Sequence, residues 1–247
     1  MIQIRKQLPN IITLCNLLCG CIAVQKAFNY DTDGATLYIL LAAVFDFFDG
    51  FVARKLGVSS PIGKELDSLA DVVSFGLAPS VMLYCFLKTQ LFPCLNTLEL
   101  SPVELLPYCA FLIAAFSAYR LAKFNLDERQ THGFLGVPTP ANALLLIGLS
   151  TSHLAEQLVY GRLWAVALIA LVVVPALCYL LVCEIPMFSF KSGKRWPYVF
   201  AIAAAVVSEA VALWHPYDGT GLLLSMLVYV GIGLGLHFFG KNHEPAA

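Results

Sequence analysis

Apolar stretches long enough to cross a lipid bilayer are the feature that most constrains how this chain can fold. A hydrocarbon core of about 30 Å is spanned by a helix of roughly 20 apolar residues. Runs of this kind lie at residues 10–28, 36–54, 66–87, 105–123, 140–158, 163–183, 197–214 and 220–239. Only 13% of the residues are charged and 59% are hydrophobic, which excludes an ordinary soluble domain. We therefore predict an all-α polytopic membrane protein with about eight transmembrane helices.

The basic residues indicate how these helices are oriented. If the N-terminus is cytoplasmic, all but three of the 15 Lys and Arg residues fall on the cytoplasmic side. The three exceptions are Lys26, Lys88 and Arg162. Because cytoplasmic loops are typically enriched in basic residues, we predict a multi-pass protein of the inner membrane with both termini in the cytoplasm. The net charge of -1 indicates no nucleic-acid partner.

Four aspartates interrupt this apolar pattern. Asp46 and Asp49 lie in the second run, and Asp67 and Asp71 lie at the start of the third. A charged side chain at the centre of a membrane helix costs about 2.5–3.5 kcal/mol, so four of them together require a functional explanation. Because residues three or four positions apart share one face of a helix, each helix presents two carboxylates from consecutive turns.

The segment between the two pairs predicts how they meet. Gly57 favours the end of one helix, and Ser60 followed by Pro61 is typical of an N-cap and first turn of the next. The two helices then run antiparallel after a short turn. We therefore expect all four carboxylates to lie together near the cytoplasmic interface.

Carboxylate oxygens are hard ligands that suit Mg²⁺ or Mn²⁺. Four negative charges would repel an anionic substrate unless about two divalent ions offset them, an arrangement used in phosphoryl chemistry. Gly50 and Ala53 leave room beside the carboxylates, and Arg54 can bind a phosphate with its planar guanidinium. A single buried Asp can instead serve a proton relay or a structural ion pair, and two can form a transporter's cation site. The small residues and Arg at fixed offsets favour the phosphate site.

The same residues match every position of the pattern D-x2-D-G-x2-A-R-x8-G-x3-D-x3-D. The matching residues are Asp46, Asp49, Gly50, Ala53, Arg54, Gly63, Asp67 and Asp71. This pattern resembles the signature of the CDP-alcohol phosphotransferases. The resemblance implies a six-helix catalytic core over residues 1–183, with residues 184–247 as an additional transmembrane helix pair, and a homodimer.

The resemblance also implies roles for individual residues. The first three aspartates would bind metal, and Asp71 would bind metal and act as the general base toward the acceptor alcohol. The region of Gly50, Arg54 and Ser60 would contact the CDP group. The residues expected to bind the CDP-activated lipid are Asn10, Thr13, Gly50, Ala53, Arg54, Ser60, Gly63 and Lys64. Asn10 and Thr13 can alternatively cap the first helix.

Three further segments resemble the branch of this family that uses serine as the acceptor. They are LPNIITLCNLLCG at 8–20, YRLAKFN at 119–125 and GFLGVPTPANA at 133–143, with Lys123 where that branch usually has Arg. The implied reaction transfers a phosphatidyl group from CDP-diacylglycerol to L-serine and releases CMP. Arg120 and Asn125 are then the candidates for binding the acceptor, although Arg120 can also be explained by the basic bias of cytoplasmic loops.

Other interpretations remain open from the sequence. The same chemistry can serve choline, glycerol phosphate or inositol as the acceptor, and intramembrane carboxylates can couple cations to a solute in a secondary transporter. A transporter often has two related halves, whereas the aspartates here cluster once. In the 133–143 segment, Pro138 and Pro140 can simply begin the fifth helix, with Thr139 as its cap.

Overall fold

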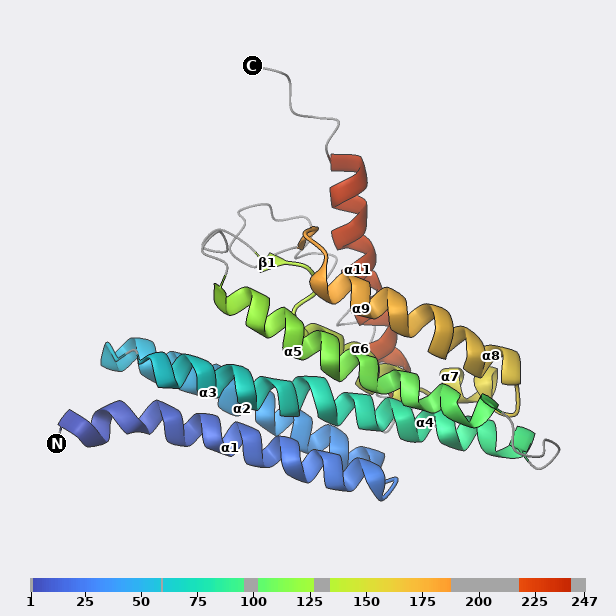
Figure 1. The fold of residues 1–247 in the computed structure, drawn as a ribbon, viewed down its shortest axis with the longest axis horizontal. Coiled ribbons are helices and arrows are strands. Elements are labelled where there is room, and N and C mark those ends of the chain that lie inside the picture. The colour runs from blue at the N-terminus through green and yellow to red at the C-terminus, as the bar shows by residue number, and fades with distance from the viewer. Residues whose placement is uncertain (1, 59, 96–101, 127–133, 188–217, 241–247) are drawn as a thin grey trace, which may run out of the picture.

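Helices account for nearly all of the computed structural model, which describes residues 2–58, 60–95, 102–126, 134–187 and 218–240 (Figure 1). The α-helices are α1 (Ile2–Phe28), α2 (Thr32–Leu56), α3 (Pro61–Asp71), α4 (Ala78–Leu95), α5 (Phe111–Leu126), α6 (Thr139–Thr151), α7 (His153–Val159), α8 (Leu163–Leu168), α9 (Val174–Val182) and α11 (Thr220–Gly240). Two π-helical segments, η1 (Val72–Leu77) and η4 (Ile169–Val173), and one 3-10 segment, η2 (Pro102–Ala110), join some of them. Strands β1 (Phe134–Leu135) and β2 (Pro186–Met187) form one short antiparallel ladder.

Within the described residues, 5 helical stretches are long and apolar enough to cross a membrane. They cover Gln7–Phe28, Thr32–Leu56, Pro61–Cys94, Pro102–Leu126 and Leu163–Val182. Two shorter apolar helices, Thr139–Thr151 and Thr220–Gly235, accompany them. The chain is therefore a multi-pass, all-α membrane protein as predicted. The predicted span at 197–214 lies outside the described residues.

Several helix boundaries differ from the prediction. Helix α1 begins at Ile2 and continues through Pro9, which lies inside the helix although it has no backbone N–H to donate there. The predicted span at 66–87 is part of a longer helical stretch from Pro61 to Leu95. The predicted span at 140–158 is divided between α6 and α7 at Ser152, whose hydroxyl accepts a hydrogen bond from the backbone N–H of Ala155 and caps the second helix.

The connection between α2 and α3 agrees with the sequence. Gly57 ends α2 in the left-handed conformation (φ 60°), a conformation that glycine adopts without a Cβ clash. Ser60 caps α3 by accepting a hydrogen bond of 2.9 Å from the N–H of Gly63, and Pro61 occupies the first turn. This short turn sets α3 beside the end of α2.

The side chain of Asp31 fixes the turn between the C-terminal end of α1 and the start of α2. Asp31 accepts hydrogen bonds of 2.9 Å from the Lys26 ammonium and from the N–H of Gly34. These two hydrogen bonds hold the pKa of Asp31 below its usual value. They close the turn so that α1 and α2 pack antiparallel along their length.

A π-helical segment follows Asp71 directly. Over η1 the helix widens before α4 continues, and such segments occur often at functional sites. Ser74 in η1 donates a hydrogen bond of 3.1 Å to the carbonyl oxygen of Asn16 in α1. Gly20 allows this approach, since a Cβ there would lie 2.5 Å from Ser74 Oγ. Helix α1 is thereby held against the part of the chain that carries Asp71.

The helices bring the predicted cytoplasmic segments to one end of the bundle. In Figure 1 the start of α1, the end of α2, the start of α3 and the end of α5 lie at the same end. Helix α11 runs at a steep angle to these helices and contacts α6. The backbones of α11 and α6 meet at Gly148, where a Cβ would lie 2.5 Å from the nitrogen of Leu223.

Candidate functional site

Three of the four aspartates form one cluster. One carboxylate oxygen from each of Asp46, Asp49 and Asp67 lies within 4.8 Å of the others. Asp49 is buried and the other two are half-buried. Asp71 lies one turn beyond Asp67 and is not a member of this group of three. Helices α2 and α3 both pack against α1, and this arrangement brings three of the four predicted carboxylates together.

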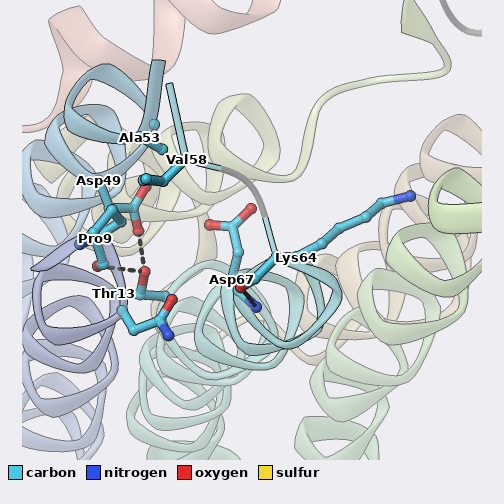
Figure 2. Close-up of a pocket in the computed structure, with 11 residues that line it drawn as sticks. Pro9, Thr13, Asp49, Ala53, Val58, Lys64 and Asp67 are labelled. Atoms are coloured by element: carbon cyan, nitrogen blue, oxygen red, sulfur yellow. Dashed lines mark hydrogen bonds between the residues drawn. The ribbon is translucent and has the colours of Figure 1, made fainter. Parts of the chain in front are cut away.

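Thr13 in α1 holds one carboxylate of this cluster. Its hydroxyl lies 2.6 Å from Asp49 Oδ2 and 3.1 Å from the carbonyl oxygen of Pro9 (Figure 2). The hydroxyl has one proton, and a hydrogen bond to a charged oxygen is the stronger of the two. The alternative that Thr13 caps α1 is wrong, because the helix already begins at Ile2. The same holds for Asn10, whose amide donates to Gln7 within the helix.

A pocket of about 350 Å³ adjoins the cluster, and Figure 2 shows the Asp49 and Asp67 carboxylates extending toward it from different helices. Its lining residues are Pro9, Asn10, Thr13, Asp49, Gly50, Ala53, Val58, Ser60, Gly63, Lys64 and Asp67. They include seven of the eight residues predicted to bind the CDP-activated lipid. The structure adds Pro9 and Val58 to the pocket wall. Their apolar side chains could not be distinguished from the many other apolar residues in the sequence.

Arg54 is the predicted lipid-binding residue that does not line this pocket. Its guanidinium folds back over its own helix, so that a Cβ at Gly50 would lie 3.2 Å from Arg54 Nη1. It also interacts electrostatically with Asp49. The absent side chain at Gly50 therefore gives the guanidinium a place beside the carboxylates.

The ammonium of Lys64 points away from the two carboxylates in Figure 2. It donates a hydrogen bond of 2.9 Å to the carbonyl oxygen of Asn125, near the end of α5. The Asn125 amide in turn donates to Ser68 Oγ at 2.8 Å. These contacts join α3 to α5. Lys64, which was predicted to bind the CDP-activated lipid, is thus hydrogen-bonded to Asn125, which was predicted to bind the acceptor.

The surroundings of Asp71 are more enclosed. Asn16 Nδ2 donates a hydrogen bond of 3.2 Å to Asp71 Oδ1, and both side chains are buried. Arg120 in α5 interacts electrostatically with Asp71 and is 8% exposed. Its Nη1 donates to the hydroxyl of Thr139 at 2.9 Å. The predicted acceptor residue Arg120 therefore lies within electrostatic reach of Asp71, whereas the Asn125 amide is hydrogen-bonded to Ser68.

Sequence reasoning did not assign Asn16 and Thr139 to the site. Thr139 is the first residue of α6, after Pro138 at the N-cap position, so the expectation that Thr139 caps the helix is wrong. Asn16 lies within the apolar run 10–28 and Thr139 directly before the run 140–158, and a buried polar group in a membrane helix needs a partner. The polar side chains of Asn16 and Thr139 beside apolar residues are therefore the feature from which both could have been predicted.

Comparison with known proteins identifies relatives of this chain. The family model described as CDP-alcohol phosphatidyltransferase matches residues 6–176. A CDP-diacylglycerol--serine O-phosphatidyltransferase of Bacillus subtilis is 33% identical over 184 residues, which cover 74% of this chain and 91% of that protein.

Two further relatives carry the same description. The protein from Mycobacterium leprae is 34% identical over 223 residues, covering 85% of this chain and 68% of the relative. The protein from Methanocaldococcus jannaschii is 38% identical over 151 residues, covering 60% of this chain and 63% of the relative. The matched family region runs from residue 6 in α1 to residue 176 in α9 and contains the whole cluster of aspartates.

Proposed function

We infer that this chain, which belongs to the CDP-alcohol phosphatidyltransferase family, transfers the phosphatidyl group of CDP-diacylglycerol to the hydroxyl of L-serine. The products are phosphatidylserine and CMP. The observation that carries the proposal is the position of Asp49 and Asp67, two aspartates of the cluster, at the wall of a pocket lined by the small and polar residues of the same motif. The printed descriptions of the B. subtilis, M. leprae and M. jannaschii relatives support serine as the acceptor.

The donor set fits a divalent cation. Asp46, Asp49 and Asp67 offer hard oxygen ligands within 4.8 Å of one another. Asp67 Oδ1 is buried and, within the part of the chain that the structure describes, has no hydrogen-bond partner. We propose that these residues, with Asp71 at their side, hold two Mg²⁺ or Mn²⁺ ions. When bound, such ions stabilise negative charge on phosphate oxygens and on the departing CMP.

Asp71 is the proposed general base. The serine hydroxyl oxygen forms a bond to the phosphorus that carries diacylglycerol, the bond from that phosphorus to the CMP oxygen breaks, and the hydroxyl proton passes to the Asp71 carboxylate. A positioned base contributes about 10²–10⁴-fold. Asn16 supports this role, because its hydrogen bond to Oδ1 fixes the carboxylate while Oδ2 remains for the hydroxyl.

The pocket is the proposed site of the CDP group. Gly50, Ala53 and Gly63 leave space along two helices, and Ser60 and Asn10 supply polar groups at the wall. Arg54 and Lys64 are cations at the same end of the bundle that can approach the diphosphate. The acyl chains of the donor would remain in the bilayer beside α2, whose outer face is exposed and apolar at Phe47, Phe48 and Phe51.

The distribution of the basic residues supports a cytoplasmic location for the site. We propose that the aspartates lie on the cytoplasmic side of the inner membrane, with both termini on that side, and that the protein is a homodimer. Residues 1–183 would form the catalytic domain and residues 184–247 an additional helix pair. The family match over residues 6–176 supports this division.

Purified protein supplied with CDP-diacylglycerol, Mg²⁺ or Mn²⁺ and labelled serine tests the proposal. We expect CMP and labelled phosphatidylserine in equal amounts. If a lipid product forms with choline, glycerol phosphate or inositol but not with serine, the proposed reaction type stands and the proposed acceptor is wrong. The absence of a lipid product with every acceptor, together with metal-dependent solute flux in vesicles, would contradict the enzyme and favour a transporter.

A further inference from the structure

Three buried polar atoms, on helices that pack against α3 or η1 around Asp71, have no hydrogen-bond partner among the residues that the structure describes. They are Asn16 Oδ1, Arg120 Nε and Asn142 Nδ2. Each belongs to a side chain that is more than nine-tenths buried, with 0% exposure for Asn16 and 1% for Asn142. An unpaired polar group away from water is costly, so such atoms generally have a partner. A bound ligand is one source of that partner.

Two of the three atoms belong to one connected set of side chains, and the third lies one helical turn away from a member of that set. Asn16 donates to Asp71, Arg120 interacts electrostatically with Asp71, and Arg120 donates to Thr139. Asn142 follows Thr139 by three residues in α6 and therefore lies on the same face of that helix. Helix α6 also contacts η1, the segment that follows Asp71. Residues from α1, α3, α5 and α6 thus converge.

Two of the unpaired atoms are hydrogen-bond donors and the third is an acceptor. Arg120 Nε and Asn142 Nδ2 are hydrogen-bond donors, which a carboxylate can satisfy. Asn16 uses its amide nitrogen on Asp71, so the free Oδ1 is an acceptor that an ammonium can satisfy. One small molecule that carries a carboxylate, an ammonium and a hydroxyl would satisfy all three atoms and present its hydroxyl to Asp71.

We propose that Arg120 and Asn142 bind the α-carboxylate of an amino-acid acceptor and that Asn16 Oδ1 binds its α-ammonium. This inference rests on the proposed function and assigns its acceptor specificity to named atoms. Choline and ethanolamine lack the carboxylate and leave the two donors unpaired. Glycerol phosphate and inositol lack the ammonium and leave Asn16 Oδ1 unpaired. A site built for hydrogen bonds rejects analogues that lack them more strongly than an apolar site rejects a missing methylene.

Analogue competition on the wild-type protein is the first test, and it needs no variant to fold. L-alanine has the carboxylate and ammonium of serine without the hydroxyl, so we expect it to inhibit competitively against serine. Ethanolamine and 3-hydroxypropanoate each lack one charged group, and we expect little competition from either at the same concentration. Equal competition by all three compounds would overturn the subsite.

The second test uses Asn142→Leu, which removes the donor and keeps a similar volume. Loss of a hydrogen bond to a charged group costs about one to two orders of magnitude in affinity. We expect KM for serine to rise at least about tenfold with KM for CDP-diacylglycerol unchanged, and inhibition by L-alanine to weaken in parallel. A merely structural role would instead lower kcat alone.

Gln90→Leu is the matched control. Gln90 is a buried side-chain amide in α4, and its Oε1 also lacks a partner within the described part of the chain. It lies 19 residues beyond Asp71 along one helical stretch, roughly 28 Å at 1.5 Å per residue. We expect both KM values to be unchanged. An unchanged KM for serine in Asn142→Leu overturns the subsite alone, whereas a wild-type protein that cannot use serine overturns the proposed function itself.

Discussion

The pocket beside the aspartate cluster and the enclosed region around Asp71 are built differently. The pocket is formed by neighbouring stretches of α1, α2 and α3, and exposed residues such as Ser60 and Lys64 stand at its wall. The enclosed region gathers buried side chains from α1, α5 and α6, which are far apart in the sequence. The difference suits a large CDP-lipid in the first region and a small polar acceptor in the second. Asp71 lies where the two regions meet.

The largest effect should come from removing divalent cations, because the proposed metal site needs them to hold the donor diphosphate. Without cations, the close carboxylates of Asp46, Asp49 and Asp67 repel the donor diphosphate. We expect chelation to reduce CMP release to background and added Mg²⁺ or Mn²⁺ to restore it. Full activity after exhaustive chelation, checked by elemental analysis, would contradict the metal assignment.

Asp71→Asn should separate binding from chemistry. The amide keeps the shape of the carboxylate and can still accept the hydrogen bond from Asn16, while it cannot accept the hydroxyl proton. We expect turnover to fall about 10²–10⁴-fold, with donor binding, measured by ligand-induced thermal stabilisation, largely retained. Asp33→Asn, at an exposed carboxylate in the first turn of α2, is the matched control and should leave turnover unchanged. Turnover retained in Asp71→Asn would refute the base assignment.

Thr13→Val should weaken the metal site without changing its ligands. The substitution keeps the side-chain shape and removes the hydrogen bond to Asp49 Oδ2. Groups that orient metal ligands typically contribute about 10–100-fold in metal affinity or activity. We expect the Mg²⁺ concentration for half-maximal activity to rise within this range.

Thr89→Val provides the comparison for Thr13→Val. The Thr89 hydroxyl donates at 2.9 Å to the carbonyl oxygen of Cys85, the same four-residue backbone contact that Thr13 makes, with no aspartate as its partner. Its metal dependence should match that of the wild type. An equal response of the two variants would show that Thr13 acts through α1 and not through Asp49.

Gly63→Ala should have the smallest effect and should act on the donor alone. A Cβ at this position would lie 3.0 Å from both Asn10 Oδ1 and Ser60 Oγ, so these side chains must shift within the pocket. We expect KM for CDP-diacylglycerol to rise about three- to tenfold, a loss of the size that one weakened polar contact causes. Gly231→Ala in α11, where a Cβ would meet no described atom within 4 Å, should leave KM unchanged.

The sequence predicted the pocket well because its residues are close together in the chain. Helical spacing sets Asp46 beside Asp49, and the cap at Ser60 with Gly57 before it predicts the short turn that joins α2 to α3. Most of the pocket wall then follows from a single motif of 26 residues with the start of α1.

The enclosed region was predicted less completely, since it depends on packing between distant helices. The residues that flank Asn16, Thr139 and Asn142 in the sequence do not indicate which helix each side chain will face. The π-helical turn after Asp71 also changes the register of α4 relative to α3, and apolar periodicity does not reveal it. The extension of α1 back to Ile2 was not predicted, because Arg5 and Lys6 interrupt the apolar pattern before residue 10.

A crossed measurement of both KM values in Gly63→Ala, Asn142→Leu and the double variant tests the central claim, that donor and acceptor occupy separate regions that meet at Asp71. We predict that Gly63→Ala raises only KM for CDP-diacylglycerol and Asn142→Leu only KM for serine. The double variant should show both increases at their single-variant sizes, because distant sites contribute independently. If either substitution raises both KM values, or both raise the same one, the two-region account is contradicted.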